Sequence, residues 1–298
     1  MDLVKGVASI TSLLINMVFW TSILFFVAIA RLLIPFKPWR HLCTKLTISI
    51  GEVCIDCNTL WMKLIHKTKL VIKGLDGADK DLWYIGTSNH QSWADIFILQ
   101  AVTNRKVPLL RFFMKDVLKW IPIVWVVGWS LDMPFLKRYS DEKLKKHPEL
   151  RGKDFAQMKK AFKRLNAIPG SVFSFAEGTR YTEEKKTNQS SPFENLLLPK
   201  AGGIGVALST MPFIDSLLDF SIYYHSDKRS FWDFLCGRMS VVEIRTRKIK
   251  IPEELKNKDY SSDSEYRENL KKWLREIWEE KNQFMRSLTS QGSNNSSC

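Results

Sequence analysis

The sequence predicts an α/β protein with a mixed sheet flanked by helices and an N-terminal transmembrane or membrane-embedded helical segment. Three observations support this class. An uncharged apolar stretch comes first, short strand-like runs alternate with helix-like runs through the middle, and a pattern with helical spacing closes the chain. With 298 residues, of which 45% are hydrophobic, the chain is long enough to bury one sizeable core.

The first segment, residues 1–35, is expected to be a membrane anchor. Gly6 to Ala30 contains no charged residue and exceeds the roughly 20 residues that cross a hydrocarbon layer. Ala28-Ile29-Ala30 is the nearest match to a signal-peptide cleavage site, but bulky residues follow it, so a retained anchor is favoured. A short re-entrant hairpin or an interfacial helix is the alternative topology.

Charged residues on either side of this stretch bear on its orientation. Asp2 and Lys5 precede it, whereas the residues that follow are basic: Arg31, Lys37, Arg40 and Lys45. The positive-inside rule then places the body of the protein on the cytoplasmic face, which is that of the inner membrane if the source is bacterial. Residues 36–70 are expected to form an amphipathic helical connection to the main domain.

The main domain is expected over residues 71–250. Strands are predicted at Leu82–Ser88, Ser171–Phe175, Asp219–Tyr224 and Val241–Ile249, and a helix at Trp93–Ala101. The apolar run Trp120–Phe135 fits a buried helix that leads into a strand, with a headgroup-level tryptophan cluster as the alternative.

The end of the chain has its own pattern. Apolar residues from Tyr266 to Trp278 recur at helical spacing with charges between them, which predicts a C-terminal amphipathic helix over 251–290. Residues 291–298 are Ser, Gln, Gly and Asn rich and are expected to be a disordered tail.

Charge and cysteine content narrow the function classes. The net charge of +14 favours anionic partners, namely a phospholipid surface, phosphorylated substrates or nucleic acid, and the apolar N-terminus favours the membrane. Cys54 and Cys57 form a Cys-x-x-Cys pair without a second regular ligand pair, so we expect no metal site and reduced thiols. The chain carries no Gly-x-Ser-x-Gly elbow and no Walker-type phosphate loop.

His90 and Asp95 are the candidate catalytic residues. His90 follows a predicted strand on a connecting turn, and Asp95 lies in the first turn of the next predicted helix, from where it can reach back to the imidazole. A carboxylate that orients a histidine makes it a general base. The alternative is a helix-capping pair, Ser92 with Asp95, beside an ordinary turn histidine.

A second polar segment follows the predicted strand that ends at Phe175. It contains Glu177, Gly178, Thr179 and Arg180, which provide a carboxylate, close backbone approach, a hydroxyl and a planar guanidinium suited to phosphate. Charged residues at a strand end seldom serve a core, although a solvated turn is the alternative.

With these two motifs the sequence resembles the glycerolipid acyltransferases, specifically the 1-acylglycerol-3-phosphate acyltransferases. Their signatures are His, four residues and Asp, followed downstream by Glu-Gly-Thr-Arg. The resemblance extends more loosely from about Val71 to Tyr224. It implies that Arg138, in Phe135-Leu136-Lys137-Arg138, grips the acceptor's phosphate, and it makes Lys200 a weaker candidate; a surface arginine in a basic run is the alternative for Arg138.

The resemblance also implies the reaction and its partners. These are a phospholipid membrane, a lysophospholipid acceptor, and acyl-CoA or acyl carrier protein as thioester co-substrate, with no cofactor, metal or nucleic acid. Glu177, Arg138 and Arg180 would position the acceptor. One departure is that Asp219–Tyr224 lacks the proline common at this place in the family, which leaves the acceptor open. Lysophosphatidylglycerol or lysocardiolipin acylation, and less so a non-catalytic membrane adaptor, are the competing functions.

Overall fold

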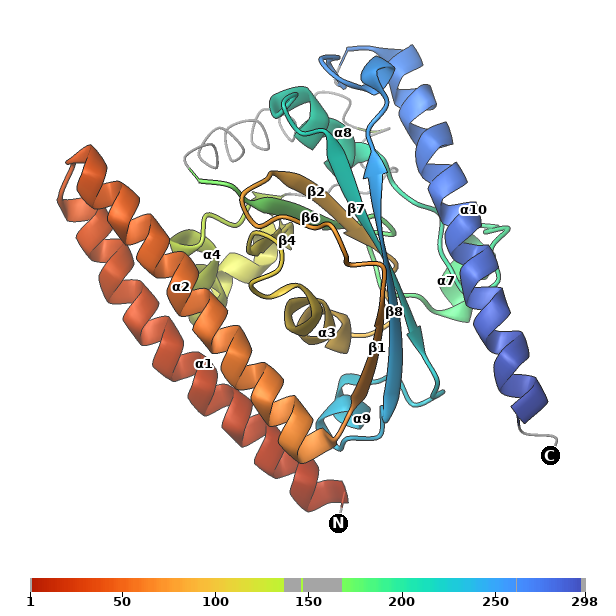
Figure 1. Ribbon diagram of the computed structural model, residues 1–298, viewed down its shortest axis with the longest axis horizontal. Helices are drawn as coiled ribbons and strands as arrows, with labels where there is room; N and C mark the ends of the chain where they lie inside the picture. Colours follow the sequence, from red (N-terminus) through yellow and green to blue (C-terminus); the bar gives the residue numbers. More distant parts are fainter. Residues whose placement is uncertain (1, 137–145, 147–167, 261, 296–298) are drawn as a thin grey trace.

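The computed structural model describes residues 2–136, 146, 168–260 and 262–295. A central sheet has an antiparallel helical hairpin, α1 and α2, on one side and the long helix α10 on the other (Figure 1). Helix α3 lies between the hairpin and the sheet in the same view.

The sheet has six strands in the order β1-β8-β7-β2-β6-β3. Their bounds are β1 Lys69–Lys73, β2 Tyr84–Ser88, β3 Leu110–Phe112, β6 Ser171–Phe175, β7 Ser216–Tyr224 and β8 Val241–Lys250. Strands β7 and β8 pair antiparallel, and the other neighbours pair parallel. The predicted mixed sheet is therefore confirmed, and its strand order is a result that the sequence did not provide.

The two central strands deliver both sequence motifs to one edge of the sheet. Strands β2 and β6 run parallel in a register that pairs Ser88 with Phe175, so their carboxyl ends lie side by side. Four of the five residues of β6, and all five of β2, are buried, as expected for parallel strands covered on both faces. His90 and Glu177 each follow these ends by two residues.

Helices cover both faces of the sheet. On one face lie α3 (Ala94–Thr103) and α9 (Phe231–Leu235), which pack with β2 and β7 in a core that includes Ile98, Phe173 and Phe220. On the other face lie α8 (Gly202–Thr210) and α10 (Ser264–Asn295), whose core includes Val172. The short helix α7, Glu183–Asn188, and the 3-10 turn η4, Glu253–Leu255, connect these layers.

The C-terminal helix begins later and continues further than expected. The periodic residues Tyr266, Leu270, Leu274 and Trp278 are all fully buried, which is the pattern predicted from their spacing. The helix continues to Asn295, so the chain is helical where a disordered tail was expected, and the last three residues lie outside the described part of the chain. This helix belongs to the same core as the sheet.

The N-terminal hairpin consists of α1 (Asp2–Leu33), α2 (Lys37–Trp61) and the π-helical turn η1 (Met62–His66). Among the described helices, α1 alone is long and apolar enough to cross a membrane. Asn16 on α1 donates to Asn58 on α2 at 2.7 Å. These contacts make the expected connection over 36–70 one arm of the hairpin.

The body of the protein holds α1 near both of its ends. Close to the N-terminus, a Cβ at Gly6 would lie only 2.9 Å from the Trp232 ring and from the Cys236 sulphur, so the glycine permits this approach. At the other end, Arg31 pairs with Asp132 at 3.0 Å. The helix is thus packed along the body of the protein.

The apolar run from Trp120 to Phe135 is less buried than expected. It forms the 3-10 turn η2 (Asp116–Trp120), α4 (Pro122–Ser130) and β5 (Phe135–Leu136), which pairs with β4 (Met114–Lys115). Only Gly128 and Ser130 of α4 are buried, whereas Trp120 is 79% exposed and Trp125 is 42% exposed. The prediction of a buried helix was wrong because α4 packs through one face, beside α1, and presents its other face outward.

Candidate active site

The turn that carries His90 begins where Asn89 leaves the sheet. The Asn89 side chain donates to the Ile222 carbonyl at 2.9 Å and accepts from the Ile222 N–H at 2.9 Å. The carboxamide thereby continues the β2–β7 ladder after its last backbone pair, Ser88 with Phe220. The backbone of His90 is released from the sheet and can turn toward α3.

His90 and Asp95 meet as the sequence predicted. The imidazole Nδ1 lies 2.8 Å from Oδ2 of Asp95, which is fully buried. The same Oδ2 accepts the backbone N–H groups of Gln91 at 2.7 Å and Ser92 at 3.0 Å. The capping interpretation and the catalytic interpretation therefore both describe this carboxylate, because the turn that it caps is the turn that presents the histidine.

Tyr224 is a site residue that the sequence analysis did not single out. Its hydroxyl donates to Oδ1 of Asp95 at 2.5 Å, and burial raises the pKa of Tyr224 well above its usual value, so the phenol stays protonated. It is the last residue of β7, in the segment noted above for lacking a proline. A tyrosine that ends a strand beside the motif strand was the available signal.

We expect Tyr224→Phe to lower the free energy of unfolding by about 1.5–3 kcal/mol, the usual contribution of a hydrogen bond to a charged group. Loss of this donor makes Asp95 more basic, which stabilises the His90 imidazolium and moves the acid limb of the kcat/KM profile to higher pH. Tyr223→Phe is the matched control, because its hydroxyl contacts Thr289 at 3.3 Å instead. Identical pH profiles for both variants would contradict a positioning role for Tyr224.

Phe175 fixes the plane of the His90 ring. The two rings are stacked with centroids 4.0 Å apart and an interplanar angle of 18°. Because Nδ1 faces Asp95, the tautomer that donates to the carboxylate leaves Nε2 with a lone pair. No group in the described part of the chain hydrogen-bonds Nε2, and 13% of the side chain remains accessible. The ring is therefore oriented as a general base with its basic nitrogen unoccupied.

Glu177 does not face the outside, which corrects its expected role as a substrate ligand. The side chain is fully buried. Its Oε2 accepts the His90 N–H at 3.1 Å and its Oε1 accepts the Leu197 N–H at 3.2 Å. A second link joins the two motifs, because the Tyr181 N–H donates to the His90 carbonyl at 2.7 Å. Glu177 thus holds the backbone of the catalytic turn.

Burial raises the pKa of Glu177 to about 8, against the hydrogen bonds that it accepts. Unfolded chains ionise this group near its ordinary value of 4.5, so folding takes up a proton between the two values. We therefore expect the free energy of unfolding to fall as the pH rises from about 5 to about 8, and to fall less in Glu177→Gln. Thermal melts of both proteins in neutral detergent across this range measure the difference. Equal slopes would contradict the shifted pKa.

The rest of the second motif forms the rim of the site. Gly178 has a φ of 72°, a left-handed conformation that favours glycine. Thr179 accepts from Lys185 at 2.9 Å. The Arg180 guanidinium lies over the exposed ring of Trp93, 4.9 Å from its centroid, which keeps its donors at the surface next to the catalytic turn.

Comparison with known proteins agrees with this geometry. A family model described as Acyltransferase matches residues 69–223, just over half of the chain. The chain belongs to the acyltransferase family. The family predicted from the two motifs is thereby confirmed.

Two known proteins are similar to this acyltransferase. It is 24% identical over 225 residues to the 1-acyl-sn-glycerol-3-phosphate acyltransferase epsilon of Mus musculus. That alignment covers 66% of this chain and 56% of the mouse protein, so the chain spans just over half of that relative's length. Its fold resembles the crystal structure of the 1-acyl-sn-glycerophosphate (LPA) acyltransferase PlsC from Thermotoga maritima, with a TM-score of 0.51, 18% identity, and coverage of 94% of this chain and 96% of PlsC.

The remaining predicted ligands of this acyltransferase are placed differently. Arg138 lies outside the described residues. The Lys200 side chain is exposed, and its backbone N–H donates to the Ala176 carbonyl at 2.7 Å, which joins it to the second motif. Arg229, which the sequence analysis missed, donates to the Gln91 side chain at 2.9 Å and so adds a cation beside the catalytic turn.

Proposed function

We propose that this acyltransferase moves a fatty acyl chain from acyl-CoA or acyl carrier protein to the sn-2 hydroxyl of lysophosphatidate, giving phosphatidate for phospholipid synthesis. The observation that carries the proposal is the His90–Asp95 pair, whose unoccupied Nε2 lies on a turn beside Arg180. A base next to a guanidinium suits an acceptor that has both a hydroxyl and a phosphate.

The proposed reaction is a direct transfer. His90 Nε2 takes the proton of the acceptor hydroxyl while the oxygen attacks the thioester carbonyl. The tetrahedral intermediate then collapses, a C–O ester bond replaces the C–S bond, and the imidazolium returns the proton to the departing sulphur. Asp95 stabilises the imidazolium throughout, and its contacts to Tyr224 and the turn backbone keep it fixed. The thioester is a co-substrate, and the route uses no resident cofactor.

Guanidinium groups are proposed to hold the acceptor. Arg180 is exposed on the motif rim and Arg229 lies on the opposite side of the turn, bonded to Gln91. Arg138 and Lys200 remain proposed ligands on the strength of the family resemblance. Bringing the two reactants into one orientation is the main gain that such a clamp provides.

The helical hairpin is proposed to attach the enzyme to the membrane with the active site on the cytoplasmic face. Its outward residues include Leu14, Ile15, Phe19 and Phe26, which are 52%, 65%, 56% and 70% exposed. The exposed Trp120 beside α4 adds an aromatic ring suited to the headgroup level. Because α1 is packed near both ends on the body of the protein, we favour embedding of the hairpin over free spanning by α1.

Transfer of labelled acyl chains from a thioester donor to a panel of lysophospholipids tests this proposal. Membranes that carry the wild-type protein are compared with membranes that carry His90→Ala. We expect His90-dependent formation of phosphatidate. His90-dependent acylation of lysophosphatidylglycerol or a lysocardiolipin instead would reassign the acceptor, and equal background transfer to every acceptor in both membranes would favour a non-catalytic adaptor.

A further inference from the structure

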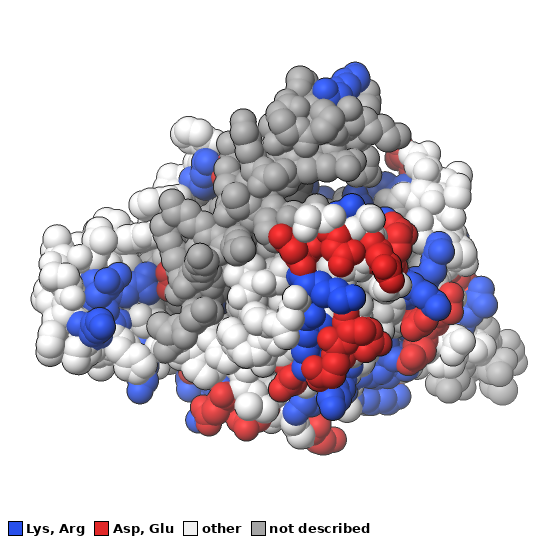
Figure 2. Space-filling view, turned by 90° about the horizontal axis from the view of Figure 1, so that it is seen from above, with Lys and Arg blue, Asp and Glu red and all other residues white. Residues whose placement is uncertain are grey.

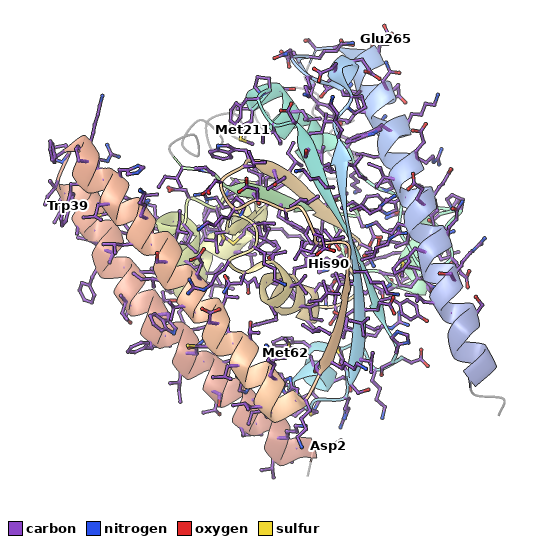
Figure 3. All side chains as sticks on the ribbon, in the orientation of Figure 1. Asp2, Trp39, Met62, His90, Met211 and Glu265 are labelled. Carbon is purple, nitrogen blue, oxygen red and sulfur yellow. The ribbon has the colours of Figure 1, made fainter. Side chains whose placement is uncertain are left out.

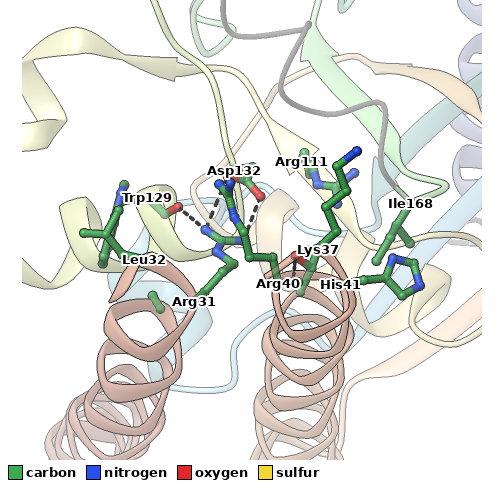
Figure 4. A pocket seen from close by; sticks show the side chains of 11 residues that line it. Arg31, Leu32, Lys37, Arg40, His41, Arg111, Trp129, Asp132 and Ile168 are labelled. Atoms are coloured by element: carbon green, nitrogen blue, oxygen red, sulfur yellow. Dashed lines mark hydrogen bonds and ion pairs between the residues drawn. The ribbon is translucent and has the colours of Figure 1, made fainter. Parts of the chain in front are cut away.

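A basic cavity lies at the tip of the helical hairpin, apart from the candidate active site. Its volume is about 820 Å³, and its lining includes the cations Arg31, Lys37, Arg40 and Arg111, together with Asp132 and Trp129 (Figure 4). These side chains come from the end of α1, the start of α2, strand β3 and the end of α4. Four segments distant in sequence thus converge on one hollow.

The charge of this cavity is not balanced by the protein. Its one carboxylate, Asp132, receives Arg31 on both oxygens, at 3.0 Å and 3.5 Å. Lys37, Arg40 and Arg111 have no carboxylate partner among the described residues. Figure 2 shows Lys and Arg side chains within uncharged surface at the left end of the molecule, which is the end with the hairpin tip in Figure 1.

Arg111 is the most informative member of the set. The residue is only 3% exposed, and its Nε donates to the Leu131 carbonyl at 3.2 Å. Its Nη1 is buried and has no hydrogen-bond partner within the described part of the chain. A buried, charged donor without a partner costs free energy. An arginine retained in such a place, on the wall of a basic cavity, is suited to an anion that enters from outside.

The cavity and the catalytic turn lie near opposite ends of β6. Arg111 approaches Gly170 immediately before this strand, since a Cβ on Gly170 would lie 1.8 Å from Nη1. His90 stacks on Phe175, the last residue of the strand. At about 3.3 Å per residue, five residues separate the two sites by roughly 16 Å. The cavity is therefore distinct from the site proposed for acyl transfer.

The neighbourhood of the cavity indicates where the anion comes from. The hairpin turn beside it exposes Leu32, Leu33, Ile34 and Phe36, at 64%, 72%, 44% and 64%. A ligand with apolar chains could lie against this turn while its phosphate occupies the cavity, and guanidinium groups are suited to phosphate. We propose that this hairpin-tip cavity binds the phosphate group of an anionic phospholipid from the surrounding bilayer.

Native mass spectrometry of the full-length protein in neutral maltoside micelles tests the proposal, with phosphatidylglycerol as the titrated probe. We expect one lipid adduct on the wild type. We expect the double substitution Lys37→Gln and Arg40→Gln to weaken that adduct by about tenfold or more, since it removes two cations near the phosphate. The matched control is Lys45→Gln with Lys63→Gln, which changes the charge of the hairpin equally at exposed positions outside the cavity.

Further arms separate the alternatives. Arg111→Met, of similar length but uncharged, is expected to lose the adduct while circular dichroism shows the native helix content. Equal weakening by both double substitutions would overturn the proposal in favour of general charge attraction. Loss of the adduct in Arg180→Gln alone would overturn it by placing the lipid in the active site. Binding of inorganic phosphate as tightly as the lipid would support a phosphate site and overturn the lipid as its source. None of these readouts depends on acyl transfer.

Discussion

Replacing His90 with alanine is expected to lower kcat for acyl transfer by about 10²- to 10⁴-fold, the usual contribution of a positioned general base. The variant keeps Asp95, whose remaining donors come from Gln91, Ser92 and Tyr224, so the turn retains its anchors. What is lost is the imidazole that takes the hydroxyl proton. Initial rates of labelled product formation at saturating donor and acceptor measure the effect.

His225→Ala is the matched control for this experiment. His225 follows β7, is partly exposed, and lies 3.6 Å from Glu243. We expect its removal to leave kcat within about twofold of the wild type, as is usual for surface changes away from a site. A loss in His90→Ala no larger than the loss in His225→Ala would contradict the assignment of His90 as the base. Equal membrane attachment of the two variants, measured by flotation, confirms that the comparison concerns chemistry.

Replacing Lys281 with methionine is expected to lower the free energy of unfolding by about 3–5 kcal/mol, because it breaks a buried ion pair and leaves a charge behind. Lys281 on α10 and Asp219 on β7 are both fully buried, and their Nζ and Oδ1 atoms lie 2.6 Å apart. Lys281 also donates to the Phe220 carbonyl. Arg247 bonds the other Asp219 oxygen at 2.8 Å, so part of the charge remains compensated. Thermal or urea unfolding in neutral detergent measures the change.

Lys271→Met on the same helix is the control for Lys281→Met. Lys271 is exposed and pairs with Glu268 at 2.6 Å, an arrangement that contributes at most about 1 kcal/mol. We expect this variant to unfold close to the wild type. Equal unfolding free energies for the two variants would show that the buried pair does not hold α10 to the sheet.

The elements of the fold were largely predictable because each has a local signal. Strand β6 was predicted at its observed residues, Ser171–Phe175, and β8 to within one residue, since apolar runs bounded by polar residues define both. The strand order was not predictable, because it depends on pairing between distant segments. The burial of α4 was mispredicted for a related reason: its composition is apolar on every side, and only the position of the hairpin determines which face is covered.

The site was predictable where one segment supplies its own geometry. His90 and Asp95 lie five residues apart on one turn, and their contact follows from a strand that ends before a helix begins. Tyr224 and Arg229 reach the same turn from segments more than 120 residues away, so sequence spacing carried no information about them. Glu177 was given the wrong role because a charged residue at a strand end usually faces solvent, whereas here it is fully buried and receives two backbone N–H groups.

The Asn89 carboxamide has a consequence for which side chains the site tolerates. One group both gives and accepts a hydrogen bond at Ile222, so its replacement must match donor, acceptor and reach together. Aspartate would set an anion against the Ile222 carbonyl, glutamine would extend one methylene too far, and serine would fall short of both atoms. Substitution at this buried amide is therefore as restrictive as substitution at the base itself, although Asn89 touches no reacting atom. Natural variation within this catalytic turn should be narrow at position 89 and broader at the exposed position 93.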